Sequence, residues 1–194
     1  SAEKKEDEKK PQTTIYYVTD EIQQSQYINM FREQGMNAVI LKHNIDSAFI
    51  THIEREKEKE NIHFQRIDAD VTNDFKEEVS ADELKDETDA LTALFRKALG
   101  KDKLEVKVEK LKNENISSMV TLSEESRRMQ DMMKMYGMAG MDPSMFGSTE
   151  TLVLNANNKL VQYIFEHKDS ENVPMFCEQL YDLALLSHKP LNPD

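Results

Sequence analysis

Residues 15–41, IYYVTDEIQQSQYINMFREQGMNAVIL, have the pattern of a strand, a helix and a second strand. The first five are rich in β-branched and aromatic side chains, and residues 38–41 are a continuous apolar run typical of a buried parallel strand. Asp20 and Gln23 have the spacing of a capping pair for the helix that joins the two strands, and Gly35 is placed to end that helix. The stretch therefore predicts the beginning of a small α/β layer.

A second helix and a third strand extend this layer. Asp46 is placed to cap the second helix, with Ile45 and Ile50 spaced as a hydrophobic staple. The helix ends in the charged run of residues 54–60, which we expect to lie on a solvated face. Residues 64–68 then have the composition of a third strand.

The second half of the chain mixes helices with short strands. Ser80 and Glu83 have the spacing of a capping box for a long helix that Gly100 ends. Residues 104–111 alternate apolar and charged side chains, which predicts a strand with one wet face. A turn separates them from residues 116–120, which we expect to pair with that strand as a hairpin.

The chain closes with a strand at residues 151–154, a helix at residues 155–165 and a last helix at residues 173–187. That last helix is apolar over more than half of its girth, so it needs a surface to pack on. The predicted fold class is therefore α+β or α/β, with a small α/β lobe followed by a domain of mixed helices and a small sheet.

Composition argues against several classes of function. The 194 residues carry a net charge of −12 at pH 7, which disfavours binding to nucleic acid or to an anionic membrane surface. No apolar run approaches the ~20 residues needed to cross a bilayer. The charged residues 1–10 contain no apolar segment of the kind found in signal peptides. We therefore expect a cytoplasmic protein.

No catalytic, cofactor-binding or metal-binding residue is predicted. The five histidines are scattered, without the spacing of a helical zinc site, and the five glycines form neither a dinucleotide-binding nor a phosphate-binding loop. The single cysteine, Cys177, lies among apolar residues, which suits a buried and unreactive thiol. The sequence gives no positive reason to regard this chain as an enzyme.

Seven of the 11 methionines lie within residues 129–145. Their spacing predicts a helical stripe that is wider than a single buried seam needs. Methionine repacks around partners of different shape, which favours a binding surface, although a stripe at this spacing is also typical of a core helix. The residues that form the stripe or lie beside it are Met129, Met132, Met133, Met135, Tyr136 and Met138.

Several phrases, in their order and spacing, resemble the heat-shock protein 90 chaperones, and the bacterial HtpG type looks closest. The resemblance covers residues 14–192. Its phrases are IYYVT from Ile15, FREQGMNAVIL from Phe31, NID from Asn44, LVLNANNKLV from Leu152 and QLYDLALLS from Gln179.

The resemblance implies a C-terminal fragment of an ATP-dependent chaperone. The ATPase, with its ATP and Mg, would lie in upstream domains, so no cofactor and no enzymatic activity are expected of this fragment. The implied segments are a charged linker at 1–13, the small α/β lobe of the middle domain at 14–72, a linker at 73–80, and the C-terminal dimerisation and client-contact domain at 81–194.

The resemblance also implies partners and sites. A short amphipathic helix of the C-terminal domain contacts unfolded client proteins in the family, and the Met-rich segment occupies its position. The middle-domain lobe adds an exposed aromatic, whose matching position here is Ala48, with Phe49 one place on. The implied homodimer interface lies on the last helix, and because the final helix of the family is lacking, we expect a weakened or non-native association. Its residues are Phe176, Leu180, Leu183, Ala184 and Leu186.

Two alternatives remain open. The chain could be a small α/β enzyme or regulatory domain whose Met helix is buried in the core. It could also be a purely structural dimerisation domain that buries the same helix. A glycine-rich or acid/base constellation at the strand ends would favour the first alternative, and the sequence lacks one. Protection of the amides of residues 126–146 from hydrogen exchange would favour the second, because an exposed client-binding helix should exchange quickly.

Overall fold

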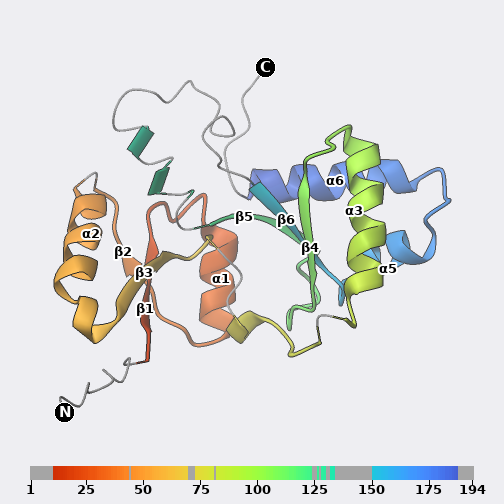
Figure 1. Cartoon of the computed structure of the whole chain (residues 1–194). Coiled ribbons are helices and arrows are strands. Elements are labelled where there is room, and N and C mark those ends of the chain that lie inside the picture. The colour runs from red at the N-terminus through yellow and green to blue at the C-terminus, as the bar shows by residue number, and fades with distance from the viewer. Residues whose placement is uncertain are drawn as a thin grey trace, which may run out of the picture.

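The computed structural model of the chain describes residues 11–187, apart from residues 44, 70–72, 81, 124–125, 127, 130–131 and 134–149. The described residues form two three-stranded sheets with helices packed on them (Figure 1). The first half contains β1 (Thr13–Val18), α1 (Ser25–Glu33), β2 (Val39–Ile40), α2 (Asp46–Glu56), β3 (Ile62–Arg66) and the short helix η2 (Asn73–Phe75). The second half contains α3 (Lys85–Leu99), β4 (Glu105–Glu109), β5 (Ser118–Leu122), β6 (Glu150–Asn155), α5 (Lys159–Glu166) and α6 (Val173–Leu186). The predicted α+β or α/β class is confirmed.

The first sheet is parallel, in the order β2-β1-β3. Side chains alternate across β1, so that Tyr17 packs with Ile50 of α2 on one face while Val18 packs with Phe31 of α1 on the other. The strand β2 lies at the edge, and both Val39 and Ile40 are exposed. The expectation of a buried strand at residues 38–41 is therefore wrong, because an apolar run alone does not fix the order of the strands.

The predicted capping pair lies in the turn before α1, which begins only at Ser25 and whose N-cap residue Gln24 makes no side-chain capping bond, and this turn uses a different glutamine from the predicted one. The carboxylate of Asp20 accepts hydrogen bonds from the backbone N–H groups of Ile22 and Gln23, as expected of a cap. The return contact comes from the buried Gln24, whose Oε1 accepts from the backbone N–H groups of Thr19 and Asp20. Gln23 therefore contributes its backbone rather than its side chain.

The predicted start of α2 also needs correction. Asp46 lies in the first turn of the helix, and its Oδ2 accepts from the backbone N–H of His43 at 2.8 Å. Ile50 is buried on the sheet, but Ile45 is exposed to solvent. The predicted hydrophobic staple therefore does not form, since only one of its two members is covered.

The second sheet has the order β4-β6-β5, with β6 parallel to β4 and antiparallel to β5. The predicted hairpin between β4 and β5 is wrong, because β6 lies between them. Leu152 and Leu154 of β6 face one core cluster and Val153 faces another, so this strand is buried on both faces. Strands buried on both faces belong at the centre of a sheet.

The helices α3 and α5 both begin later in the sequence than predicted. The helix α3 begins at Lys85, and the carboxylate of Glu83 accepts from Lys110 Nζ at 2.5 Å instead of closing a capping box with Ser80. Gly100 ends α3 at φ +62°, as predicted. The helix predicted from residue 155 begins at Lys159, because the preceding residues end β6 and form a turn.

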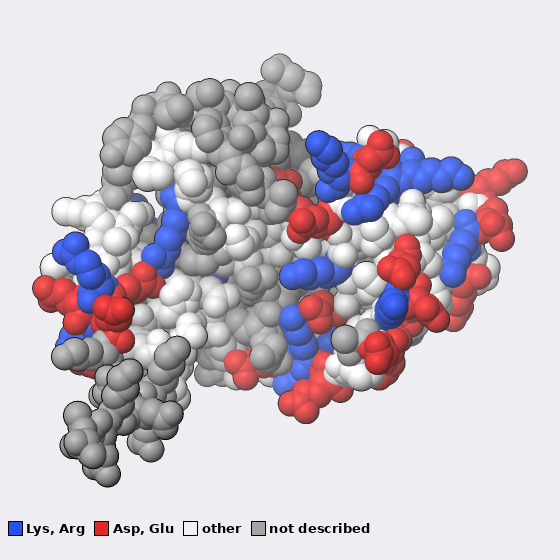
Figure 2. Space-filling model, viewed as in Figure 1, with Lys and Arg blue, Asp and Glu red and all other residues white. Residues whose placement is uncertain are grey.

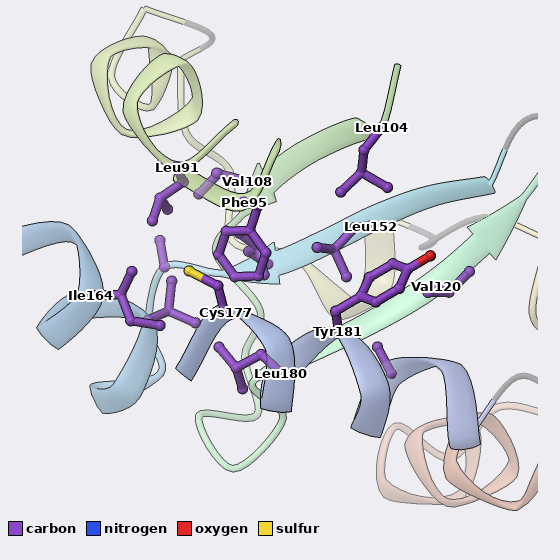
Figure 3. Packing of buried hydrophobic residues seen from close by; sticks show 14 of the residues in the cluster. Leu91, Phe95, Leu104, Val108, Val120, Leu152, Ile164, Cys177, Leu180 and Tyr181 are labelled. Atoms are coloured by element: carbon purple, nitrogen blue, oxygen red, sulfur yellow. The ribbon is translucent and has the colours of Figure 1, made fainter. Parts of the chain in front are cut away.

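The largest core cluster lies between the second sheet and the helices α3, α5 and α6. Figure 3 shows Phe95 of α3 and Cys177 of α6 turned toward one another, with Leu152 of β6 beside them. All three are fully buried. The apolar α6 thus finds the surface that its composition requires within the same chain.

The other face of the second sheet packs on the first half of the chain. Met119 of β5 and Val153 of β6 share a cluster with Phe31 of α1, so α1 lies between the two sheets (Figure 1). Phe75 belongs to the same cluster and is buried. The segment 73–80, expected to be a linker, therefore contributes to the core that joins the two halves.

No helix among the described residues is long and apolar enough to cross a membrane.

Candidate functional site

The Met-rich segment begins as a helix with a local cap. The described residues Ser126, Arg128, Met132 and Met133 are helical. The backbone N–H of Ser126 donates to the hydroxyl of Ser123 at 3.2 Å, which is the contact of an N-cap serine. Our sequence analysis missed this cap, although a serine followed by two acidic residues is a sequence signal for a helix start.

The methionine stripe is divided between solvent and core. Met132 is 46% exposed, whereas the adjacent Met133 is 7% exposed and Met129 is half-buried. The other predicted members of the stripe, Met135, Tyr136 and Met138, lie outside the described residues. Met132 is therefore the described methionine of this helix that a partner could reach most readily, and Met133 is covered by the chain itself.

Phe49 is the second exposed apolar residue of the predicted site. It lies in the first half of α2 with its side chain 49% exposed. The next residue, Ile50, packs against Tyr17 and Phe64 on the sheet. One face of α2 is therefore buried on the sheet, and Phe49 lies on a different, exposed face. A large aromatic side chain left half in water on an ordered helix is a suitable contact point for an apolar partner.

A partly buried ion pair joins these two helices. The guanidinium of Arg128 contacts the carboxylate of Glu54 twice, with Nη1–Oε2 at 2.7 Å and Nη2–Oε1 at 2.9 Å. Nη2 also donates to the backbone carbonyl of Phe64 at 3.2 Å. Such two-pronged contacts between arginine and a carboxylate fix geometry as well as charge. Met132 lies four residues beyond Arg128 in the sequence, and Phe49 lies on the same helix as Glu54.

Glu54 is the centre of this group. Besides Arg128, its Oε1 accepts from the backbone N–H of Phe64 at 2.7 Å and lies 3.2 Å from His63 Nδ1. Burial raises the pKa of the carboxyl, but the hydrogen bonds from Arg128 and Phe64 and the charges of Arg128 and His63 outweigh it, so the pKa is lowered from its ordinary value of 4.5. Glu54 is therefore ionised at neutral pH and accepts hydrogen bonds from Arg128 and from the backbone N–H of Phe64.

The sequence did not reveal this contact. Glu54 begins the charged run of residues 54–60, which we expected on a solvated face, but only 18% of its side chain is exposed. Its partner lies 74 positions away. Local spacing carries no signal for such a pair, because only the packing of the second half on the first brings the two side chains together.

The predicted interface residues of α6 fall into two sets. Leu180 and Ala184 are fully buried in the core of the same chain. Phe176 is partly buried and packs edge-on against Tyr163, with ring centroids 5.9 Å apart. Leu183 and Leu186 are exposed. The interface itself stays a prediction, and it now rests on Leu183 and Leu186.

The described residues offer little for chemistry. Among them, no group of three or more His, Cys, Asp or Glu side chains is placed to hold a metal ion. Cys177 is buried, and burial together with the charge of Glu178 raises the pKa of its thiol to about 11. Figure 2 shows Lys and Arg interspersed with Asp and Glu over the half that carries α3 and α6.

Comparisons with known proteins identify the family that the chain resembles. The sequence profile of the family described as "Hsp90 protein" matches residues 3–189. The chaperone protein HtpG of Bacteroides fragilis is 32% identical over 172 residues, which are 84% of this chain and 24% of the relative. The HtpG proteins of Porphyromonas gingivalis and Helicobacter pylori are 28% and 29% identical over 92% and 96% of the chain. The chain spans about a quarter of the length of these relatives.

Proposed function

Because the chain belongs to the Hsp90 family, we propose that it is part of a molecular chaperone and binds unfolded client proteins through Phe49 and Met132. The observation that carries this proposal is their exposure on two helices that the Glu54–Arg128 ion pair holds together. The proposal assigns the chain to the C-terminal part of the whole chaperone.

The expected affinity follows from apolar burial. Covering an exposed Met or Phe side chain contributes roughly 1.5–3 kcal/mol, of which the ordering of the client offsets a part. Two such contacts supply about 3–6 kcal/mol before that offset, which corresponds to binding in the millimolar range or weaker at one site. A second copy of the chain would raise the apparent affinity by bivalence.

The experiment is binding of a labelled, permanently unfolded protein to the chain and to a Met132→Glu variant. Introducing a charge at the contact should weaken binding about tenfold or more, since a buried unpaired carboxylate replaces an apolar contact. Phe49→Glu should have an effect of similar size. Circular dichroism and thermal unfolding establish that both variants keep their fold.

Met175→Glu is the matched control, because Met175 is 47% exposed on α6 and Met132 is 46% exposed. The control should bind the unfolded protein as the wild type does. Equal binding by the wild type and the Met132→Glu and Phe49→Glu variants would refute the assignment of the site. A loss with Met175→Glu as well would indicate a nonspecific effect of added negative charge.

The proposal includes two expectations for the whole protein. We propose that the exposed Leu183 and Leu186 contribute to a homodimer. We also propose that ATP and Mg act in parts of the whole protein other than this chain, so the chain alone should neither bind nor hydrolyse ATP. Saturable nucleotide binding by the purified chain in a calorimeter would contradict the second expectation.

The burial of Met133 favours a second candidate function. A structural domain that only packs its Met-rich helix into the core would bury the methionines of that helix. Met133, which is 7% exposed, meets this expectation. The same Met132→Glu variant distinguishes the two candidates. A purely structural helix predicts unchanged binding of unfolded protein, or no binding by the wild type.

A further inference from the structure

We propose that Glu54 and Arg128 are positioning residues. Their ion pair docks the helical segment that bears Met132 onto α2, and it thereby fixes where Met132 lies relative to Phe49. The proposal concerns how the site is built. Its statement about client affinity rests on the proposed function, but its statement about docking does not.

The contact has the geometry of a specific attachment. Both nitrogens of the guanidinium fork meet both oxygens of the carboxylate, at 2.7 and 2.9 Å, and the third contact reaches the carbonyl of Phe64 on β3. Only 32% of the Arg128 side chain and 18% of the Glu54 side chain are exposed. Reduced solvent screening makes such a pair stronger than an exposed one.

Contacts other than the one with Arg128 also hold the carboxylate of Glu54 in place. The backbone N–H of Phe64 fixes Oε1 from the sheet, and His63 Nδ1 lies beside the same oxygen. Glu54 is therefore anchored to α2 and β3, whereas Arg128 belongs to a helix that is distant in sequence. Removing Arg128 leaves the contact between Glu54 and the sheet intact, so a variant at Arg128 tests docking alone.

The position of Arg128 in the sequence links the ion pair to the placement of Met132. Met132 is four residues beyond Arg128 in the sequence, and both residues are helical. Fixing Arg128 on α2 therefore limits the orientations in which Met132 can meet a partner that also contacts Phe49. A preorganised pair of contacts binds more tightly than two that move independently, because less ordering accompanies binding.

The test is amide hydrogen exchange in an Arg128→Met variant, with exchange rates followed at Met129, Met132 and Met133. We expect these amides to exchange about tenfold faster than in the wild type, while the amides of α2, β3 and β6 keep their rates. An Arg128→Lys variant keeps the charge without the two-pronged contact, and we expect an intermediate rate.

The matched control is Lys57→Met, which removes the cation from the exposed Lys57–Glu60 pair of the same half, 2.9 Å apart. Its exchange pattern should equal that of the wild type. Unchanged exchange at Met129, Met132 and Met133 in Arg128→Met would overturn the proposal. Faster exchange throughout the chain would overturn it as well, because Arg128 would then support the whole fold rather than one helix.

Client binding provides the second measurement. If the proposed function holds, Arg128→Met should weaken binding of the unfolded protein about threefold to tenfold without removing any apolar contact. If Met132→Glu leaves binding unchanged, the proposed function fails while the exchange result still decides the docking proposal. The two failures are therefore distinguishable.

Discussion

The hydroxyl of Tyr27 donates a hydrogen bond to the backbone carbonyl of Val120, at 2.7 Å and across 93 positions of sequence. Tyr27 lies on α1 and Val120 on β5, so the bond connects the first half of the chain to the second sheet. Both residues are buried. A hydrogen bond in this position contributes to the packing of the two halves as well as satisfying a buried hydroxyl.

Replacing Tyr27 with phenylalanine should lower the free energy of unfolding by about 1–2 kcal/mol, because the carbonyl of Val120 loses this buried donor while the ring still fills its place. Urea unfolding measures the change. Tyr163→Phe is the control, since Tyr163 is partly exposed at the surface of α5, and it should change the free energy of unfolding by less than about 0.5 kcal/mol. Equal effects of the two substitutions would contradict the role assigned to Tyr27.

Local features of the fold could be predicted from the sequence. The glycine at residue 35 lies at φ +65° and the one at residue 100 at φ +62°, and each follows a helix as its residue type predicted. The last helix, α6, has nearly the predicted bounds because its apolar residues are numerous and continuous. These features depend on neighbours within a few residues, which are visible in a single sequence.

Relationships between distant segments could not be predicted. The insertion of β6 between β4 and β5 depends on which strand can be buried on both faces. Local patterns do not reveal this order, because β6 is separated from β5 by a long stretch of sequence. The same reason applies to the site. Met132 was identified by residue type and spacing and Phe49 by the family resemblance, but the ion pair between Glu54 and Arg128 depends on how the halves pack.

The buried amide of Asn155 is another long-range feature, and it supports a second prediction. Its Oδ1 accepts from the backbone N–H groups of Leu111 and Asn157, and its Nδ2 donates to the backbone carbonyls of Asn113 and Ile116. The side chain is fully buried. This amide therefore fastens the end of β6 to the loop between β4 and β5.

Asn155→Asp should lower the free energy of unfolding by about 3 kcal/mol or more, because both donated bonds disappear and a carboxylate oxygen faces two carbonyls. The same change at Asn158 is the matched control. Asn158 accepts from the backbone N–H groups of Leu160 and Val161 as the N-cap of α5, and aspartate caps a helix equally well. Its Nδ2 also donates to the backbone carbonyl of Glu114, but this bond is exposed, so water can replace the lost donor. Urea unfolding should show a change within about 1 kcal/mol for Asn158→Asp. Similar losses at the two positions would argue against the network described for Asn155.

The exposed side of α6 yields a third prediction. If Leu183 and Leu186 take part in self-association, Leu183→Glu should shift sedimentation velocity profiles toward the monomer while circular dichroism stays unchanged. Leu180→Glu one turn earlier should instead unfold the chain, since Leu180 is fully buried in the core. Identical sedimentation of the wild type and Leu183→Glu over a wide concentration range would show that this side of α6 does not mediate association.

The buried thiol of Cys177 makes stability depend on alkaline pH. Burial and the charge of Glu178 raise its pKa from 9.0 to about 11 in the folded chain. Between these values the unfolded chain releases the proton while the folded chain retains it, so the thiol's contribution is complete below pH 9 and is lost as the pH rises to about 11. At 1.36 kcal/mol for each unit of pKa, the loss amounts to roughly 3 kcal/mol.

Comparison with Cys177→Ala isolates this contribution, because other groups that titrate in the same range are common to both proteins. The free energy of unfolding, measured in urea at pH 8 and at pH 10.5, should fall further in the wild type than in Cys177→Ala. Parallel pH dependence in the two proteins would mean that the folded and unfolded thiols share one pKa. In that case the sulfur would have to be accessible to water, contrary to its place between α3 and α6.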